Sequence, residues 1–211
     1  MFFYAEGIVV AEAWMLQVQG LRFAYPECAV LQSLSFTSPA GLVLVRGDES
    51  SGKTTLLRLL AGELAPQGGR IALQGGTRGA GHTFWADPRS AEWDKLTAQA
   101  WLDGLPARYP GWDATALTAH IDGFALQEHL AKPFYALSTG SKRKVLMAGA
   151  LASGAPLTLI DEPVGGLDKP SVAYLARALA QVAGQSGRVV VVAHYEALPG
   201  VPWSTVVYLP G

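Results

Sequence analysis

An alternation of apolar and polar residues marks four short stretches early in the chain. The alternating stretches are residues 16–18, 21–25, 34–37 and 70–74. A period of two residues is typical of strands that have one buried and one exposed face. Pro26 and Glu27 predict a turn between the second and third stretches. Together these stretches predict an antiparallel β portion.

Three nearly unbroken apolar runs have a different character. They cover residues 41–46, 157–160 and 189–192. Such runs are typical of parallel strands that are buried on both faces of a sheet. Helices are expected at residues 55–61, with Gly62 as C-terminal cap, and at residues 172–182. The order predicts an α/β core with a mostly parallel sheet, and residues 205–208 predict its last edge strand.

Between about residues 88 and 153 the strand signals fade and a helical period dominates. Leu117, His120, Ile121 and Phe124 have the spacing of one helix face. We therefore expect a helical subdomain that is inserted into a single domain spanning residues 15–211. Residues 1–14 do not join the pattern that begins at Met15, and we expect a loose extension or the product of an upstream start codon.

Composition favours a globular protein that does not bind nucleic acid as its main function. Half of the 211 residues are hydrophobic, 16% are charged, and the net charge is −1. Cys28 is the single cysteine, which excludes a disulfide framework and fits a reducing cytosol. No apolar run approaches the roughly 18 residues that span a bilayer, and the first residues lack the basic start of a secretion signal. We expect any membrane role to come through a partner.

The most specific motif is a match to the phosphate-loop pattern G-x-x-x-x-G-K-[ST]. It consists of Gly47, Asp48, Glu49, Ser50, Ser51, Gly52, Lys53 and Thr54, and Thr55 continues into the predicted helix. The glycines allow a tight turn with N–H groups facing phosphates, and a helix N-terminus favours anions. Lys53 is expected to reach the outer phosphates and Thr54 to bind Mg²⁺. The flanking strand and helix argue against an accidental match in a surface turn.

Two carboxylates follow the buried strand at residues 157–160. Asp161 comes directly after the strand, and Glu162 follows it. In a phosphate-loop fold, an acid at the end of a neighbouring strand lies where Mg²⁺ needs a further ligand. We expect Asp161 to bind the metal and Glu162 to polarise a water that attacks the terminal phosphate. An ordinary strand end with a polar turn is the alternative.

A basic helix start lies at residues 138–144. Ser138 is a good N-cap, and Gly140 allows a close backbone approach. Lys142, Arg143 and Lys144 then crowd a helix N-terminus, where the helix dipole disfavours cations. Two interpretations remain open on these residues: an anion is held at the helix start, or a capped helix has a solvated basic face.

These motifs stand in the order and spacing of ATP-binding-cassette (ABC) ATPases. The matching segments are the phosphate loop, residues 137–141, residues 160–163, residues 166–168 and His194. From about Met15 onwards the chain resembles the nucleotide-binding subunit of an ABC transporter of compact bacterial type, such as the haem-exporter ATPases.

The resemblance implies a P-loop NTPase fold with a mostly parallel core sheet, an antiparallel β subdomain and an inserted α-helical subdomain. It implies that the chain binds ATP and Mg²⁺ and hydrolyses ATP to drive a separate integral membrane permease. The implied assembly is a homodimer, or a pair with a similar ATPase subunit, at the cytoplasmic, inner face of the cell membrane. The resemblance identifies neither the transported substrate nor its direction.

The resemblance also implies roles for further residues. The family signature falls on Ser138, Thr139 and Gly140, and in the family this segment binds the terminal phosphate of ATP held by a second subunit. Asp168 matches the loop that contacts the opposite subunit, and His194 matches a histidine that touches the terminal phosphate. Tyr25 lies where the family stacks an aromatic ring on adenine. On the residues alone, a structural histidine and a half-buried strand tyrosine are the alternatives.

The chain departs from the family pattern at two places. Thr139 replaces the first glycine of the signature and Ser141 replaces its glutamine, which predicts a weaker contact across the dimer. The family also has a metal-contacting glutamine before the helical subdomain, and Asp87 is the matching residue here. We expect Asp87 to bind the metal or a water.

Three functional hypotheses remain. The first is a transporter ATPase, and one cassette without a further domain favours it. The second is a non-transport cassette ATPase, which usually has tandem cassettes or a long coiled coil. The third is a nucleotide-binding module with little turnover, to which the two departures point.

Tryptophans cluster near and within the helical insertion. They are Trp85, Trp93, Trp101 and Trp112. Core packing of a small subdomain is one interpretation, and an aromatic groove for a partner helix with Trp93 as its anchor is the other.

Overall fold

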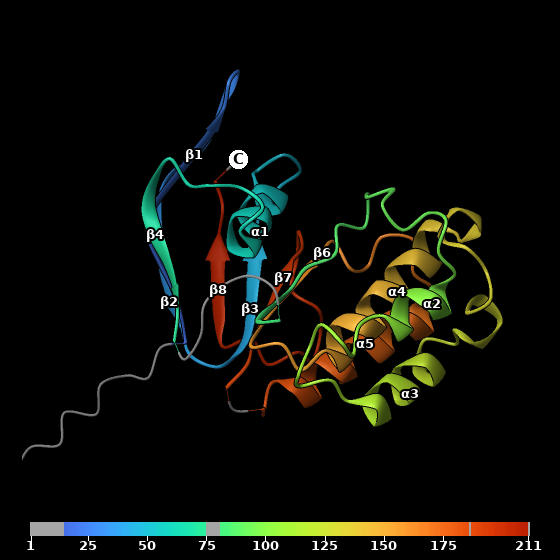
Figure 1. Ribbon diagram of the computed structural model, residues 1–211. Coiled ribbons are helices and arrows are strands. Elements are labelled where there is room, and N and C mark those ends of the chain that lie inside the picture. Colours follow the sequence, from blue (N-terminus) through green and yellow to red (C-terminus); the bar gives the residue numbers. More distant parts are fainter. Residues whose placement is uncertain (1–14, 75–80, 186, 211) are drawn as a thin grey trace, which may run out of the picture.

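Two sheets and a group of helices make up the protein, for which the computed structural model describes residues 15–74, 81–185 and 187–210 (Figure 1). The predicted extension, residues 1–14, lies outside the described residues. In chain order the elements are β1 (Leu16–Tyr25), β2 (Cys28–Ser38), β3 (Gly41–Arg46), α1 (Lys53–Ala61), β4 (Gly68–Leu73), β5 (Thr83–Phe84), α2 (Ala98–Asp103), α3 (Ala114–Gly123), η1 (Gln127–His129), η2 (Phe134–Ala136), α4 (Thr139–Ala152), β6 (Leu157–Asp161), α5 (Lys169–Val182), β7 (Val189–Ala193) and β8 (Thr205–Tyr208).

The antiparallel sheet has the strand order β2-β1-β4, which confirms the predicted antiparallel portion. The two stretches expected at residues 16–18 and 21–25 are one strand. Its register against β2 shifts between Val18 and Leu21, so a bulge separates the two alternating patterns.

The core sheet has the order β5-β6-β7-β3-β8, and all its pairs are parallel. Its apolar runs reflect burial on both faces. Leu42 and Val190 pack into a core with the helical portion, whereas Val43 and Val191 pack into a second core with α1 and β1. β8 forms one edge, as predicted.

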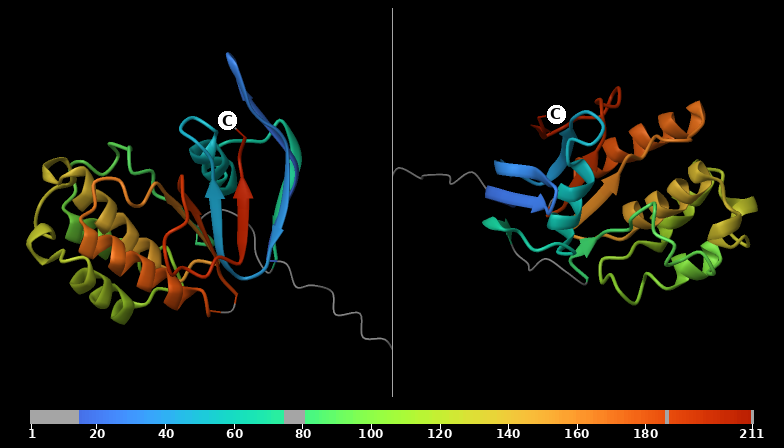
Figure 2. Two further views of the ribbon diagram at one scale, coloured as in Figure 1. Left: turned by 180° about the vertical axis from the view of Figure 1, so that it is seen from behind. Right: turned by 90° about the horizontal axis from the view of Figure 1, so that it is seen from above.

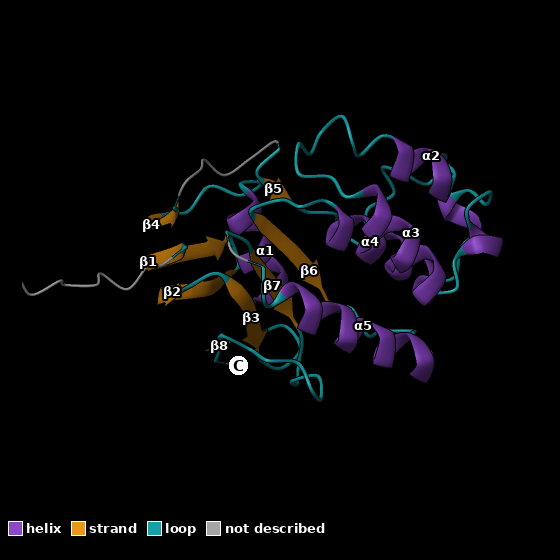
Figure 3. Cartoon of the chain, turned by 90° about the horizontal axis from the view of Figure 1, so that it is seen from below, coloured by secondary structure: helices purple, strands orange, loops and turns teal. Residues whose placement is uncertain are grey.

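Helices cover both faces of the core sheet. α1 lies between the core sheet and the antiparallel sheet, while α4 and α5 lie on the opposite face with α2 and α3 beyond them (Figures 1 and 2). The named elements between β5 and β6 are helices, and they gather beside α5 when the chain is seen from below (Figure 3). The predicted α/β class, with a parallel core sheet, an antiparallel β portion and inserted helices, is therefore confirmed.

Candidate functional site

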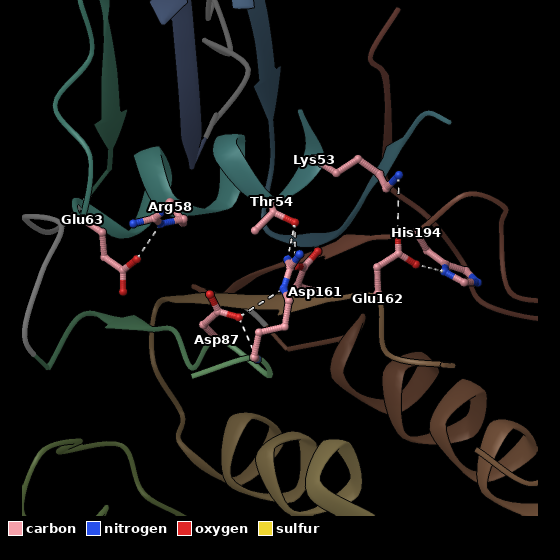
Figure 4. Close-up of polar contacts among 9 residues, drawn as sticks. Lys53, Thr54, Arg58, Glu63, Asp87, Asp161, Glu162 and His194 are labelled. Carbon is pink, nitrogen blue, oxygen red and sulfur yellow. Dashed lines mark hydrogen bonds and ion pairs between the residues drawn. The ribbon is translucent and has the colours of Figure 1, made fainter. Parts of the chain in front are cut away.

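The predicted site residues meet at the carboxyl ends of three neighbouring parallel strands. The phosphate loop follows β3, Asp161 ends β6, and His194 follows β7 (Figure 4). β7 lies between β6 and β3, so a short distance across the sheet joins segments that are far apart in sequence. This is the edge at which open α/β sheets bind ligands.

The phosphate loop leaves the start of α1 uncapped by any side chain. Gly52 precedes the helix in a left-handed conformation with φ of 93°, which glycine adopts without strain. The first N–H groups of α1 consequently have no side-chain acceptor, as an anion site requires. Lys53 folds back, and its Nζ donates hydrogen bonds to the backbone oxygens of Gly47 and Asp48, both at 2.8 Å.

Glu162 joins the phosphate loop to the strand end of β7. Its Oε1 lies 3.3 Å from Lys53 Nζ, and its Oε2 lies 2.9 Å from His194 Nδ1 (Figure 4). A carboxylate accepts hydrogen bonds, so this contact assigns a proton to Nδ1 of His194. Glu162 also has a φ of 44°, an uncommon conformation for a residue with a side chain. Such strain concentrates at functional sites.

Asp161 and Thr54 form the second polar centre of the site. Thr54 Oγ1 donates to Asp161 Oδ2 at 2.7 Å, while Oδ1 of the same carboxylate is buried without a hydrogen-bond partner among the described atoms. Burial raises the pKa of Asp161, and the Thr54 hydrogen bond and the Arg89 charge oppose that rise. A buried carboxylate with a free oxygen next to a hydroxyl suits a hard cation with oxygen ligands.

No group of three His, Cys, Asp or Glu side chains that could hold a metal ion occurs in the parts of the chain that the structure describes. The Thr54–Asp161 pair still fits Mg²⁺, because Mg²⁺ at phosphate sites uses one or two carboxylates together with substrate phosphates and water.

Arg89 completes this centre and is missing from the residues that the motifs predict. Its Nη2 donates to Thr54 Oγ1 at 2.7 Å and to Asp161 Oδ2 at 2.8 Å. Asp87, the predicted metal residue, accepts a 2.9 Å hydrogen bond from the Arg89 backbone N–H. Asp87 is thus joined to the Thr54–Asp161 pair through Arg89. The only sequence signal for Arg89 is a cation two residues after Asp87.

An open cleft of about 770 Å³ runs along the phosphate loop. Tyr25 lines one part of it and packs edge to face on Phe23, with ring centroids 5.0 Å apart. The predicted loop residues in its lining are Glu49, Ser50, Gly52, Lys53, Thr54 and Thr55, together with Asp161 and Glu162. Cys28, Val30, Arg143 and Tyr195 also line the cleft, and the motifs do not predict them.

The predicted signature lies at the first turn of α4. Ser138 caps the helix, as expected, by accepting a 3.1 Å hydrogen bond from the Ser141 backbone N–H. Ser138 and Thr139 are exposed, whereas Gly140 is buried. A side chain at Gly140 would collide with the backbone oxygen of Gly166, so the close approach expected from this glycine is a contact within the chain.

The three cations of α4 have partners within the chain. Lys142 lies 3.2 Å from Asp94, Lys144 lies 2.8 Å from Asp168, and Arg143 donates to the Gly165 backbone oxygen at 2.9 Å. These contacts relieve the conflict with the helix dipole, so the cations by themselves do not call for an external anion.

Asp168 serves as the N-cap of α5 and accepts a 2.8 Å hydrogen bond from the Ser171 backbone N–H. The hydrogen bonds from Lys144 and from Ser171 hold its pKa well below the ordinary range.

Three of the four predicted tryptophans, Trp93, Trp101 and Trp112, pack in the helical portion, whereas Trp85 packs against the second core. Trp93 is half-buried, and its ring centroid lies 5.7 Å from that of Trp101 and 6.2 Å from that of Phe134. Trp101 is buried in the core of the helical portion. The rings therefore support the core interpretation of Trp93 and Trp101.

A phosphate loop between strand and helix, facing an acid pair at the end of a neighbouring strand, defines a phosphate-loop nucleoside triphosphatase. Residues 31–165, more than half of the chain, match the family described as ABC transporter. The chain belongs to this family and is the nucleotide-binding subunit of an ABC transporter. This confirms the resemblance drawn from the motifs.

Curated relatives and solved structures agree with the assignment. The cytochrome c biogenesis ATP-binding export protein CcmA of Ruegeria pomeroyi is 34% identical over 183 residues, which cover 86% of this chain and 85% of the relative. The protein of the same name from Pseudomonas putida is 34% identical over 187 residues, which cover 85% of this chain and 89% of the relative.

Among solved structures, one described as the ATP-binding subunit of an ABC transporter superposes with a TM-score of 0.72 at 22% identity, covering 85% of this chain and 79% of that one. CbiO1 of Clostridium perfringens, part of the ABC transporter complex cbiONQ, superposes with a TM-score of 0.62 at 20% identity, covering 88% of this chain and 80% of that one. At these identities the structures support the fold.

Membership in the family establishes the general activity. The protein binds and hydrolyses ATP and acts with membrane permease subunits, as expected. Within the residues that the structure describes, no helix is long and apolar enough to cross a membrane.

Proposed function

We propose that the protein hydrolyses Mg-ATP with Glu162 as the residue that polarises the attacking water. The observation that carries this proposal is the contact of Glu162 with Lys53 at 3.3 Å and with His194 at 2.9 Å. His194 orients the carboxylate and supports the transition state, while Lys53 moves to the outer phosphates when ATP enters. The loop residues from Gly47 to Thr55 hold the phosphates, and Tyr25 stacks on the adenine.

The proposed metal position uses Thr54 and Asp161 as ligands, with Asp87 acting on the metal or on a water. Mg²⁺ supplies positive charge that neutralises the phosphate oxygens during transfer. The buried, unpartnered Oδ1 of Asp161 supports this assignment. The Thr54–Asp161 hydrogen bond orients both groups before the nucleotide binds.

The proposed active assembly is a homodimer, or a pair with a similar ATPase subunit, closed around two nucleotides. Ser138, Thr139 and Gly140 of each copy contact the terminal phosphate held by the other, and Asp168 contacts the opposite subunit. The exposure of Ser138 and Thr139 at a capped helix start supports this arrangement. Residues 15–211 act as one domain whose helical subdomain, about residues 88–153, faces an integral membrane permease.

The proposed location is the cytoplasmic, inner face of the cell membrane, where that permease would hold the subunit. The names of the relatives, cytochrome c biogenesis ATP-binding export proteins, favour an export direction.

A module with little turnover is the second candidate. Lys53 is held by Glu162, and Arg89 donates to Thr54 Oγ1 and to one carboxylate oxygen of Asp161, so hydrolysis requires that several contacts rearrange. The altered signature residues Thr139 and Ser141 point the same way.

The Glu162→Gln variant separates the two candidates. We expect it to release phosphate from Mg-ATP at least about 100-fold more slowly than the natural protein, because it lacks the carboxylate base. It should retain ATP and elute as a dimer with Mg-ATP and as a monomer without nucleotide. Phosphate release that is no faster in the natural protein than in Glu162→Gln would refute the catalytic role of Glu162. Negligible release by both proteins would favour the low-turnover candidate.

A further inference from the structure

Arg89 brings a positive charge to the two oxygens that suit a metal ion. Its Nη2 lies 2.7 Å from Thr54 Oγ1 and 2.8 Å from Asp161 Oδ2, within a triangle closed by the 2.7 Å hydrogen bond between these oxygens. The Arg89 side chain is 63% exposed, whereas the Asp161 side chain is 1% exposed. The guanidinium therefore reaches from the cleft surface to a buried carboxylate.

The charge of Asp161 explains why a cation is needed here. A buried carboxylate is costly unless it is paired with positive charge, and Arg89 is the cation in direct contact with it. The same hydroxyl and the same carboxylate would hold Mg²⁺. Thr54 and Asp161 cannot serve both cations at full strength, because two positive charges at adjacent positions repel each other.

Arg89 also has access to the nucleotide. It lines the same cleft as Lys53 and Thr54. A guanidinium has five N–H donors, and the contacts with Thr54 and Asp161 use Nη2 alone. Nε lies 3.6 Å from Oδ1 of Asp87. The Nη1 donors can meet phosphate oxygens, for which arginine has a suitable geometry.

We propose that Arg89 is a resident cation of the Thr54–Asp161 pair, which competes with Mg²⁺ and partly replaces it when nucleotide binds without metal. This inference rests on the proposed binding of Mg-ATP. It makes Arg89 a residue that sets the metal requirement of the site. Arg89 therefore neutralises the Asp161 carboxylate before nucleotide arrives, and its guanidinium would have to move for Thr54 and Asp161 to hold Mg²⁺.

The test is the dissociation constant of the β,γ-imido analogue of ATP, measured by calorimetry in excess Mg²⁺ and in EDTA. The informative quantity is the ratio of the EDTA value to the Mg²⁺ value. Arg89→Gln removes the competitor in Mg²⁺ and the substitute cation in EDTA, so we expect this ratio to rise about tenfold or more. Arg89→Lys keeps a charge but loses the planar fork, and its ratio should lie between that of the natural protein and that of Arg89→Gln.

Arg58→Gln is the matched control. Arg58 lies on α1, pairs with Glu63 at 3.1 Å and is 37% exposed, so its loss should leave the ratio unchanged (Figure 4). An unchanged ratio in Arg89→Gln with intact Mg²⁺-dependent binding would overturn the inference alone. Absence of analogue binding by the natural protein under both conditions would overturn the proposed function, and the inference with it.

Discussion

The cleft at the phosphate loop and the exposed start of α4 are both helix N-termini with a nearby glycine and cations. They differ in how their charges are paired. In the cleft, Lys53 contacts Glu162 and Arg89 contacts Asp161, so the polar groups that face a ligand hold one another. At the start of α4, Lys144 contacts Asp168, and neither of these residues lines the cleft.

This difference indicates two kinds of site. In the cleft a ligand has to exchange existing contacts for its own, so side-chain changes there should alter nucleotide affinity directly. The start of α4 is already satisfied within the chain and offers a fixed surface. Changes at Gly140 or Lys144, which do not line the cleft, should alter the stability of the fold, or the approach of a second copy, and leave ATP binding by a single chain nearly unaffected.

The largest expected effect is the loss of nucleotide affinity in Lys53→Ala. Lys53 is 7% exposed and is held by two backbone oxygens and Glu162. Its removal takes away the phosphate contact and leaves Glu162 without this cation. Losing one partner of a desolvated charge contact costs about 2–5 kcal/mol, so the dissociation constant for Mg-ATP should rise by about 100-fold or more.

Lys144→Ala is the control for this comparison. Lys144 also pairs closely with a carboxylate, at 2.8 Å from Asp168, but it lies on α4. We expect a change in ATP affinity of less than about twofold, because no nucleotide group of the same copy would contact it. Equal losses of affinity in the two variants, measured by calorimetry, would remove the distinction between the two sites.

The second effect in size concerns Gly140→Ala. The added methyl group would meet the backbone oxygen of Gly166, which lacks a flexible side chain to move aside. Overpacking of this kind costs about 1–3 kcal/mol, so the melting temperature should fall by about 6 °C. ATP affinity of the single chain should remain within about twofold of the natural value.

Gly184→Ala is the matched substitution, because a methyl group there would meet nothing within 4 Å. It should change the free energy of unfolding by less than about 0.5 kcal/mol. If Gly140→Ala had the same melting temperature as Gly184→Ala, the start of α4 would be able to move away from Gly166 at little cost. That result would contradict the view that it is a fixed surface.

The sequence could predict the elements that lie in contiguous motifs, but not the contacts between residues far apart in the chain. The phosphate loop and the acid pair at Asp161 lie in contiguous motifs, and the strands beside them are marked by their own apolar runs, so the sheet and the cleft were predictable. Arg89 was not, because its partners lie 35 and 72 residues away and no motif links them. The pairing of Lys144 with Asp168 over 24 residues likewise depends on how α4 and α5 pack.

The smallest expected effect concerns His120, which lies on α3, the helix that packs against α4. His120 is 7% exposed, and its Nδ1 lies 2.9 Å from the Tyr174 hydroxyl on α5. Burial first, and the Arg188 charge second, lower the pKa of His120 from 6.5 to about 4, and Asp113 opposes the shift.

Between these two pKa values the unfolded chain binds a proton that the native protein does not, so the free energy of unfolding falls as the pH decreases from 6.5 towards 4. At pH 5.5 the loss attributable to His120 is about 1.4 kcal/mol, which corresponds to about 4 °C in melting temperature. His120→Asn cannot take up this proton but can still hydrogen-bond Tyr174, so its melting temperature should fall less than that of the natural protein between pH 7.5 and pH 5.5. Parallel profiles for the two proteins would assign the acid sensitivity to other groups. A smaller fall of the melting temperature with decreasing pH in the variant would show that the acid sensitivity arises in the helices that support α4, away from the carboxylates of the cleft.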